Sequence, residues 1–237
     1  MGMNKNQVVT ALVVAAGSGT RMKLSGDVNK VFLELDSSPV LAHTLQAFEK
    51  CKLVDKIIIV TRECDIPLCI QLAYEYNISK LLCVVRGGDT RTDSVKNGLM
   101  QIEDKESYVA IHDGARCLVT PEELENVILA AHEHGASALA VACKDSLKRV
   151  TDDGFIESSV SRENAYRVQT PQVFRVSDII AAHEKAQKDG VILTDDCGAA
   201  QYAGIKVKIV DGSETNIKLT VQDDIVLAKA IINQRSL

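Results

Sequence analysis

Short apolar segments alternate with amphipathic segments along most of this chain, and this alternation limits the folds open to it. Runs of strand length that are almost continuously apolar occur at 8–14, 56–60, 81–85, 108–112 and 138–142. Strands that are apolar on both sides are typical of a parallel sheet covered by helices on both faces. We therefore predict an α/β fold with a Rossmann-like, mostly parallel sheet flanked by helices.

The segments between these runs place apolar residues at helical spacing. Helices are expected at 40–50, 68–76, 94–102, 176–188, 195–202 and 221–233, with a last strand at 206–210. One more helix follows Thr120, which is placed to cap it, while Pro121 suits its first turn and Glu123 completes a capping box. Gly135 is expected to end this helix.

The alternation breaks near residue 144. Two short runs, 147–151 and 155–160, flank an Asp-Gly turn, so we predict a β-hairpin. A hairpin inserted into a parallel α/β domain would project outward, which makes the segment at about 144–170 a candidate dimerisation arm. Because the alternation resumes afterwards, residues 1–237 are interpreted as one domain with an arm rather than as two domains.

The overall charge excludes some classes of partner. The formal net charge is −5, and a chain without a broad basic field is not suited to nucleic acids or membrane surfaces. The five histidines form no zinc-ligand spacing. The seven cysteines include no Cys-x-x-Cys pair, which is typical of reduced thiols. We expect a cytoplasmic protein, or a plastid one if the source is eukaryotic, although no transit peptide is recognisable.

The first apolar run leads directly into a glycine-rich segment, Ala15-Ala16-Gly17-Ser18-Gly19, which is followed by Arg21 and Lys30. Glycine allows several backbone N–H groups to approach one anion, and the two cations add charge where a phosphate chain would lie. The segment is not a P-loop, because the Gly-Lys-Ser/Thr of that motif is absent. It is not a dinucleotide fingerprint either, because Met22 stands where a third small residue is needed. It predicts a site for a nucleoside triphosphate.

Two further strand ends carry polar motifs. Gly87-Gly88-Asp89 follows the run 81–85, and Asp113-Gly114-Ala115-Arg116 follows the run 108–112. The carboxyl ends of parallel strands meet at one edge of a sheet and bind ligands there. A carboxylate beside a triphosphate normally holds Mg²⁺, so Asp113 is the candidate metal ligand. Asp93 and Thr194 are interpreted first as helix caps.

Taken together, these motifs resemble the nucleotidyltransferase family that condenses CTP with 2-C-methyl-D-erythritol 4-phosphate. That family's pattern is Ala-Ala-Gly-x-Gly-x-Arg-Met, a later lysine, Gly-Gly-x-x-Arg-x-Asp-Ser, His-Asp-x-Ala-Arg, Thr-Pro-Gln, Thr-Asp-Asp/Glu and Asn-Ile-Lys. The chain carries all of these motifs in order between Ala15 and Thr220. Each motif is weak alone, but the ordered set is specific.

The resemblance implies a role for individual residues toward CTP. The phosphates and ribose would be cradled by Ala15, Ala16, Gly17 and Gly19. Charge on the α-phosphate would be stabilised by Arg21 and Lys30. The cytosine would be recognised by Gly88, Asp89 and Ser94.

It also implies a site for the sugar-alcohol phosphate. Asp113 would bind Mg²⁺ and the erythritol hydroxyls together with Gly114, Ala115 and Arg116. The rest of the site would be lined by Ser146, Arg162, Thr170, Thr194 and Lys218. Arg162 and Lys218 would orient the substrate phosphate. In this family the hairpin arm reaches across a homodimer, so Ser146 and Arg162 would serve the partner's site.

The chain departs from the family pattern at a few positions. Cys117 stands where proline usually follows His-Asp-x-Ala-Arg, and Asn29-Lys30-Val31 replaces Pro-Lys-Gln. Ser146 replaces a threonine and keeps the hydroxyl. The interval between Arg21 and Lys30 is slightly long. None of these departures removes a charged group.

Three other functions remain open on the sequence. A ribitol 5-phosphate cytidylyltransferase is closely similar, although such enzymes tend to carry a bulkier residue where Ala115 stands. An NAD-dependent dehydrogenase is disfavoured by Met22 and by the lack of a ribose-binding acid. A catalytically inactive binding protein is the third.

Overall fold

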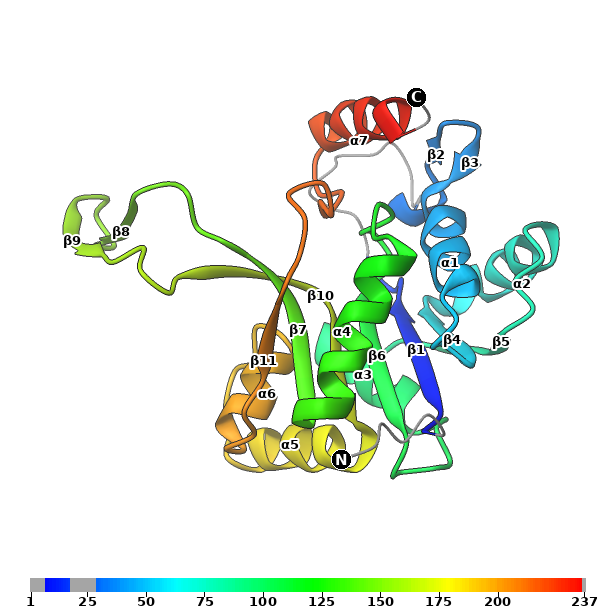
Figure 1. Cartoon of the computed structure of the whole chain (residues 1–237), viewed down its shortest axis with the longest axis horizontal. Coiled ribbons are helices and arrows are strands. Elements are labelled where there is room, and N and C mark those ends of the chain that lie inside the picture. Colours follow the sequence, from blue (N-terminus) through cyan, green and yellow to red (C-terminus); the bar gives the residue numbers. More distant parts are fainter. Residues whose placement is uncertain (1–6, 18–28, 236–237) are drawn as a thin grey trace.

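A computed structural model describes residues 7–17 and 29–235 of the chain. Its central sheet has the strand order β11-β7-β10-β6-β1-β4-β5 (Figure 1). The strands are β1 (Val9–Val14), β4 (Lys56–Thr61), β5 (Leu81–Arg86), β6 (Tyr108–Asp113), β7 (Ala136–Ala142), β10 (Tyr166–Arg175) and β11 (Lys208–Asp211). Only β10 runs antiparallel to its neighbours β6 and β7, so the predicted mostly parallel sheet is confirmed.

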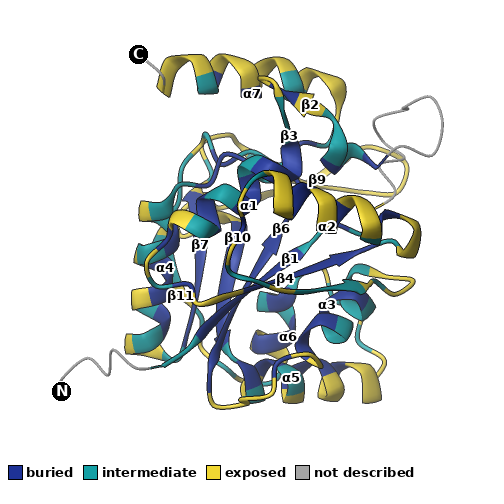
Figure 2. Cartoon of the chain, turned by 90° about the vertical axis from the view of Figure 1, so that its right-hand side faces the viewer, coloured by how far each residue is buried: buried dark blue, intermediate teal, exposed yellow. Residues whose placement is uncertain are grey.

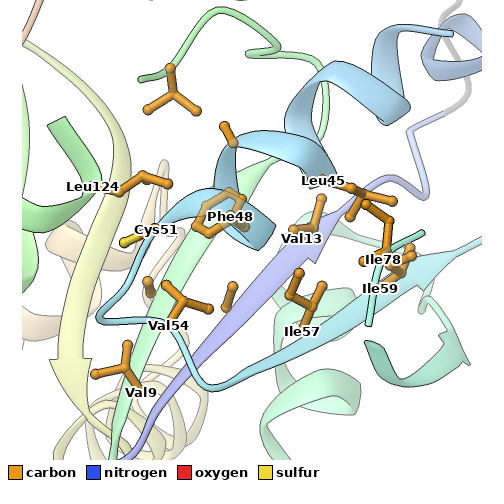
Figure 3. Packing of buried hydrophobic residues seen from close by; sticks show 14 of the residues in the cluster. Val9, Val13, Leu45, Phe48, Cys51, Val54, Ile57, Ile59, Ile78 and Leu124 are labelled. Atoms are coloured by element: carbon orange, nitrogen blue, oxygen red, sulfur yellow. The ribbon is translucent and has the colours of Figure 1, made fainter. Parts of the chain in front are cut away.

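Helices cover both faces of this sheet, as predicted. One face packs against α1 (Val40–Lys50), α2 (Ile66–Glu75) and α4 (Pro121–His134), and the other against α3 (Arg91–Leu99), α5 (Val176–Lys188) and α6 (Asp196–Tyr202). Val13 of β1 joins the first core with Phe48 and Ile57 (Figure 3), whereas its neighbour Leu12 joins the second. Figure 2 shows the central strands of the sheet buried and the outer faces of the helices exposed.

The helix boundaries follow local capping chemistry. The Thr120 hydroxyl and the Glu123 side chain form the expected capping box of α4, and Gly135 ends that helix with a positive φ of 90°. Helix α3 starts earlier than predicted, because Thr90 and Asp93 form a second capping box. The interpretation of Asp93 as a capping residue is confirmed. The N-cap of α6 is Asp195, so the capping role expected for Thr194 was wrong.

Strand β10 was not predicted, since the alternation was expected to resume only after residues 170–172. These residues lie inside the strand, and the register shifts between Val168 and Gln172 on the side of β7. The Thr170–Pro171 peptide bond is cis. Proline normally marks a strand edge or a bulge, and here it lies at the irregularity of a central strand.

The predicted hairpin is present as a separate two-stranded sheet of β8 (Leu147–Val150) and β9 (Ile156–Val160). It extends away from the main sheet (Figure 1). Phe155 and Ile156 near its tip are 71% and 68% exposed. Exposed large apolar side chains that cluster on one segment indicate a contact surface. The dimerisation role of this arm stays a prediction.

A third apolar cluster lies above the sheet and was not predicted as a unit. The chain forms a short 3₁₀ turn η2 (Lys30–Phe32) and the small hairpin β2 (Glu34–Leu35) and β3 (Ser38–Pro39). A second 3₁₀ turn, η3 (Glu63–Asp65), follows β4. Leu35 packs with Ala228 and Ile231 of the last helix, α7 (Gln222–Arg235).

Within the described ranges, no helix is both long enough and apolar enough to cross a membrane.

Candidate active site

A cavity of about 410 Å³ opens at the carboxyl ends of β1, β5 and β6. The predicted site residues that line it are Ala15, Ala16, Gly17, Lys30, Gly88, Asp89, Ser94, Asp113, Ala115 and Lys218. They come from five separate stretches of sequence. The expectation that the strand-end loops and their cations converge on one pocket is therefore met by the described residues.

The loops after β1 and β5 approach each other so closely that only glycine fits at position 87. A Cβ atom on Gly87 would lie 2.6 Å from the Cβ of Ala16 and 2.8 Å from the Oγ of Ser94. Any larger residue would push the β5 loop away from the β1 loop. Gly114 is less constrained, because its Cβ would lie 3.2 Å from the Val14 carbonyl oxygen, a contact that a small shift could relieve.

Ser94 holds the second loop in place. Its buried hydroxyl donates to the Thr90 carbonyl oxygen at 2.9 Å and accepts from the Gly88 backbone N–H at 3.1 Å. Because Thr90 and Asp93 cap the helix, Ser94 is left to orient Gly88 at the cavity wall.

Asp113 is the electrostatic centre of the cavity. Its side chain is 11% exposed, and its oxygens lie 3.2 Å from Arg91 Nε, 2.8 Å from Lys218 Nζ and 3.7 Å from Arg116 Nε. Burial alone would raise the pKa of Asp113, but the charges of Arg91, Lys218 and Arg116 outweigh it and hold the pKa below its ordinary value. Asp113 is therefore a carboxylate at neutral pH.

Arg91 is a site residue that was not predicted. Its guanidinium lines the cavity and bridges Asp113 to Asp196, whose oxygen lies 2.8 Å from Nη1. Asp196 is fully buried and also contacts His183 Nε2 at 3.0 Å. Burial would lower the pKa of Arg91, but the two carboxylates raise it instead, so the guanidinium stays charged. The only sequence signal was its place in the Gly-Gly-x-x-Arg motif.

Three other predicted residues, Thr170, Arg116 and Gly114, lie next to Asp113 and hold the backbone around it. The Thr170 hydroxyl accepts from the Asp113 backbone N–H at 3.1 Å, and Arg116 donates to the Asn216 carbonyl oxygen at 2.8 Å. Gly114 packs against the end of β1. These three residues lie around the carboxylate without lining the cavity itself.

Some predicted residues are not brought into this cavity. Thr194 is exposed and does not line it, and Ser146 and Arg162 lie exposed in the connections of the arm. Arg162 donates to the Lys144 carbonyl oxygen at 2.6 Å. Gly19 and Arg21 lie outside the described residues. The described part of the chain also contains no group of three or more His, Cys, Asp or Glu placed to hold a metal.

His112 lies directly beneath the site, and it makes a pH-dependent contribution to stability. It is fully buried, packs edge-on against Phe48, and places its ring nitrogens 3.1 Å from the Arg116 carbonyl oxygen and from the Thr170 hydroxyl. Burial lowers the pKa of His112 from 6.5 to about 4. The imidazole is therefore neutral in the folded protein.

We expect stability to fall as the pH drops from 6.5 towards 4. In this window the unfolded chain binds a proton at His112 that the folded chain does not, so the unfolding free energy should decrease by about 2 kcal/mol between pH 7 and pH 5. Urea unfolding at the two pH values measures it. His112→Asn should reduce the pH slope, whereas His134→Asn, at an exposed position, should not. An unchanged slope in His112→Asn would contradict the assignment.

Residues 9–234 match the family model described as 2-C-methyl-D-erythritol 4-phosphate cytidylyltransferase (IspD). Relatives of that name from Clostridium acetobutylicum and Desulforamulus reducens are 39% and 41% identical over 228 and 229 residues. These alignments cover 96% of this chain and 98% and 97% of the relatives.

Solved structures give the same result. The 4-diphosphocytidyl-2C-methyl-D-erythritol synthase of Anaerococcus prevotii superposes with a TM-score of 0.83 at 31% identity, over 96% of this chain and 99% of that one. The Francisella tularensis 2-C-methyl-D-erythritol 4-phosphate cytidylyltransferase superposes with a TM-score of 0.79 at 28% identity, over 94% and 99% of the two chains. With its fold, its cavity and these matches, the chain belongs to the 2-C-methyl-D-erythritol 4-phosphate cytidylyltransferase family.

Proposed function

We propose that this protein transfers CMP from CTP to 2-C-methyl-D-erythritol 4-phosphate, releasing pyrophosphate, as a step of isoprenoid precursor biosynthesis. Membership of the family supports the reaction. The observation that carries it is the single cavity in which the glycine-rich loop after β1, Lys30, Asp113 and Lys218 meet. Such a cavity suits a polyphosphate and a second anion side by side.

The reaction requires the two anionic substrates to be positioned and their charge to be neutralised, and it requires no general base. A phosphate oxygen of the sugar-alcohol phosphate attacks the α-phosphorus of CTP in line, and pyrophosphate leaves. The nucleophile is already an anion near neutral pH, so the main barrier is the approach of two anions. We assign Arg21 and Lys30 to the α-phosphate, and Ala15, Ala16, Gly17 and Gly19 to the phosphates and ribose.

The remaining assignments separate the two substrates. Gly88, Asp89 and Ser94 face the cytosine, and Asp113 and Ala115 face the erythritol chain, while Gly114 and Arg116 support Asp113 from outside the cavity wall. Lys218 and Arg162 orient the substrate phosphate, with Ser146, Thr170 and Thr194 completing that site. The ion pair between Lys218 and Asp113 supports this division, because a hydroxyl and a phosphate bound there would meet a carboxylate and an ammonium 2.8 Å apart.

Nucleotidyltransferases of this family generally use a divalent metal, and we propose Mg²⁺ with Asp113 as its protein ligand. Among residues 7–17 and 29–235, Asp113 Oδ1 pairs with Arg91, whereas Oδ2 pairs with both Lys218 and Arg116, so Oδ1 is the oxygen with fewer cationic partners in this part of the chain. Mg²⁺ is commonly held by one or two carboxylates together with substrate phosphates, and this donor set fits such a shared ion. When bound, the ion would neutralise charge on the triphosphate.

We further propose that residues 1–237 form one cytoplasmic nucleotidyltransferase domain that acts as a homodimer. The exposed Phe155 and Ile156 of the arm would pack on a partner. The exposed positions of Ser146 and Arg162 outside the cavity suit a role in the partner's site.

Pyrophosphate release from CTP tests the function. We expect release with 2-C-methyl-D-erythritol 4-phosphate that is at least tenfold faster than with ribitol 5-phosphate, because the small Ala115 in the cavity wall leaves room for a branched chain. Omitting Mg²⁺ should abolish product formation. Faster release with ribitol 5-phosphate would favour the alternative cytidylyltransferase. Binding of NAD without binding of CTP would revive the dehydrogenase alternative.

A further inference from the structure

The residue before Lys30 is buried beneath the cavity and makes hydrogen bonds to three partners. Asn29 is 1% exposed. Its amide nitrogen donates to the Ala15 carbonyl oxygen at 2.7 Å and to Asp65 Oδ2 at 3.0 Å. Its amide oxygen accepts from the Val31 backbone N–H at 3.3 Å. One side chain thus uses both donor hydrogens and its acceptor inside the protein.

Two of these partners, Ala15 and Asp65, are themselves held by further contacts. The Ala15 backbone N–H donates to the Val60 carbonyl oxygen of β4 at 2.7 Å, so the sheet fixes the peptide that Asn29 contacts. Asp65 receives Arg62 Nε at 2.7 Å and Arg62 Nη2 at 3.1 Å, a bidentate ion pair that orients its carboxylate. Asn29 therefore joins the end of β1 to the turn after β4.

The contact bears directly on Lys30. Asn29 is the N-cap of the 3₁₀ turn η2, which begins at Lys30, and its amide oxygen caps that turn. Lys30 and Ala15 both line the cavity. The Asn29 amide therefore sets the position of the Lys30 backbone relative to the loop that carries Ala15, Ala16 and Gly17.

We propose that Asn29 is a positioning residue for the transfer reaction, holding Lys30 in register with the phosphate-binding backbone through its side-chain amide. This inference rests on the proposed function. Asn29 does not line the cavity and acts only through Lys30. Displacing a catalytic cation by about 1 Å can lower turnover by as much as about 100-fold.

Proline is a second informative substitution at position 29, because the family pattern usually has proline there. Asn29 has φ −74° and ψ 126°, values that proline also adopts. Asn29→Pro would therefore keep the backbone conformation and remove the amide. Asn97→Ala is the matched control, because Asn97 also donates from its side chain to a backbone carbonyl, that of Arg86 at 3.1 Å, but lies outside the cavity.

The experiment measures pyrophosphate release, with folding checked by circular dichroism. We expect Asn29→Ala to lower kcat by about 10- to 100-fold with a smaller change in KM for CTP. Asn29→Pro should be similarly impaired, and Asn97→Ala should match the parent protein. If Asn29→Ala does not fold, Asn29→Thr removes the amide while keeping nearly the same side-chain volume.

A double-mutant cycle with Lys30→Ala separates positioning from a general structural role. If Asn29 acts through Lys30, adding Asn29→Ala to Lys30→Ala should lower kcat by less than about 3-fold. Equal losses in both backgrounds would overturn the proposal, as would an unaffected Asn29→Ala or full activity in Asn29→Pro.

Failure of the proposed function can be told apart from failure of this inference. A parent protein that releases no pyrophosphate with either sugar phosphate would reject the function. Calorimetric titration with CTP then still tests the amide, because Asn29→Ala should weaken binding by at least 3-fold relative to Asn97→Ala. Equal affinities of the two variants would reject the positioning role.

Discussion

Replacing Arg91 by methionine should destabilise the protein by about 3–5 kcal/mol, the range expected when one partner of a buried ion pair is removed. Arg91 Nη1 lies 2.8 Å from Asp196, whose side chain is fully buried, and its Nε lies 3.2 Å from Asp113. Methionine has similar length but leaves both carboxylates without this cation. The free energy of unfolding from urea titration measures the effect.

The matched control is Arg86→Met. Arg86 also forms an ion pair, with Glu63 at 3.1 Å, but both side chains are largely exposed at 70% and 72%. Exposed pairs contribute about 0–1 kcal/mol, so this variant should stay close to the parent protein. Equal destabilisation by the two variants would contradict the special role of Arg91. Adding Asp196→Asn to Arg91→Met should recover part of the loss, because the unpaired buried charge is then gone.

The sheet and most helices could be predicted from the sequence because their burial is periodic. Strand β1 alternates between two cores, with Val13 facing one and Leu12 the other, and both faces are apolar. The convergence of three loops follows from the parallel direction of their strands, since such strands share one carboxyl edge. These features need only local pattern and a general rule of topology.

Strand β10 could not be predicted because its buried centre is polar. Gln169, Thr170 and Gln172 are all at most 6% exposed. Their side chains hydrogen-bond to distant groups, including the Ser213 carbonyl oxygen, His112 Nδ1 and Asp195 Oδ2. A strand of this kind has no apolar pattern, so a search for hydrophobic periodicity does not detect it, although its buried polar side chains are hydrogen-bonded across the fold. Such partners are visible only in three dimensions.

The residues that hold the site together could not be predicted from the sequence for the same reason. Arg91 and Asp196 are 105 positions apart in sequence and form one ion pair. In the sequence, Asn29 differs from a family pattern and carries no other signal, although its amide donates to Ala15 and Asp65. Motifs locate residues that face the cavity, whereas the residues that hold them depend on tertiary contacts.

Asp113→Asn should have the largest effect on turnover among the described residues. The substitution keeps the shape but removes the negative charge that faces Arg91, Arg116 and Lys218. These cations would then repel one another in a largely buried site, and the erythritol hydroxyl would lose its carboxylate acceptor. We expect kcat/KM for 2-C-methyl-D-erythritol 4-phosphate to fall by about 100- to 1,000-fold, with KM for CTP changed by less than about 3-fold.

A Mg²⁺ titration of the same variant tests the metal assignment separately. If Asp113 Oδ1 contributes to the ion, the half-saturating Mg²⁺ concentration of Asp113→Asn should rise by at least about 5-fold, since Mg²⁺ prefers an anionic oxygen over an amide oxygen. Asp211→Asn is the control, because Asp211 also ends a strand, β11, but is exposed and lies outside the cavity. A fall in kcat/KM at an unchanged half-saturating concentration would remove Asp113 from the metal site and leave it as the acceptor for the substrate hydroxyls. An unchanged kcat/KM would instead contradict its place at the centre of the cavity, because three cations would have lost their common counter-charge without consequence.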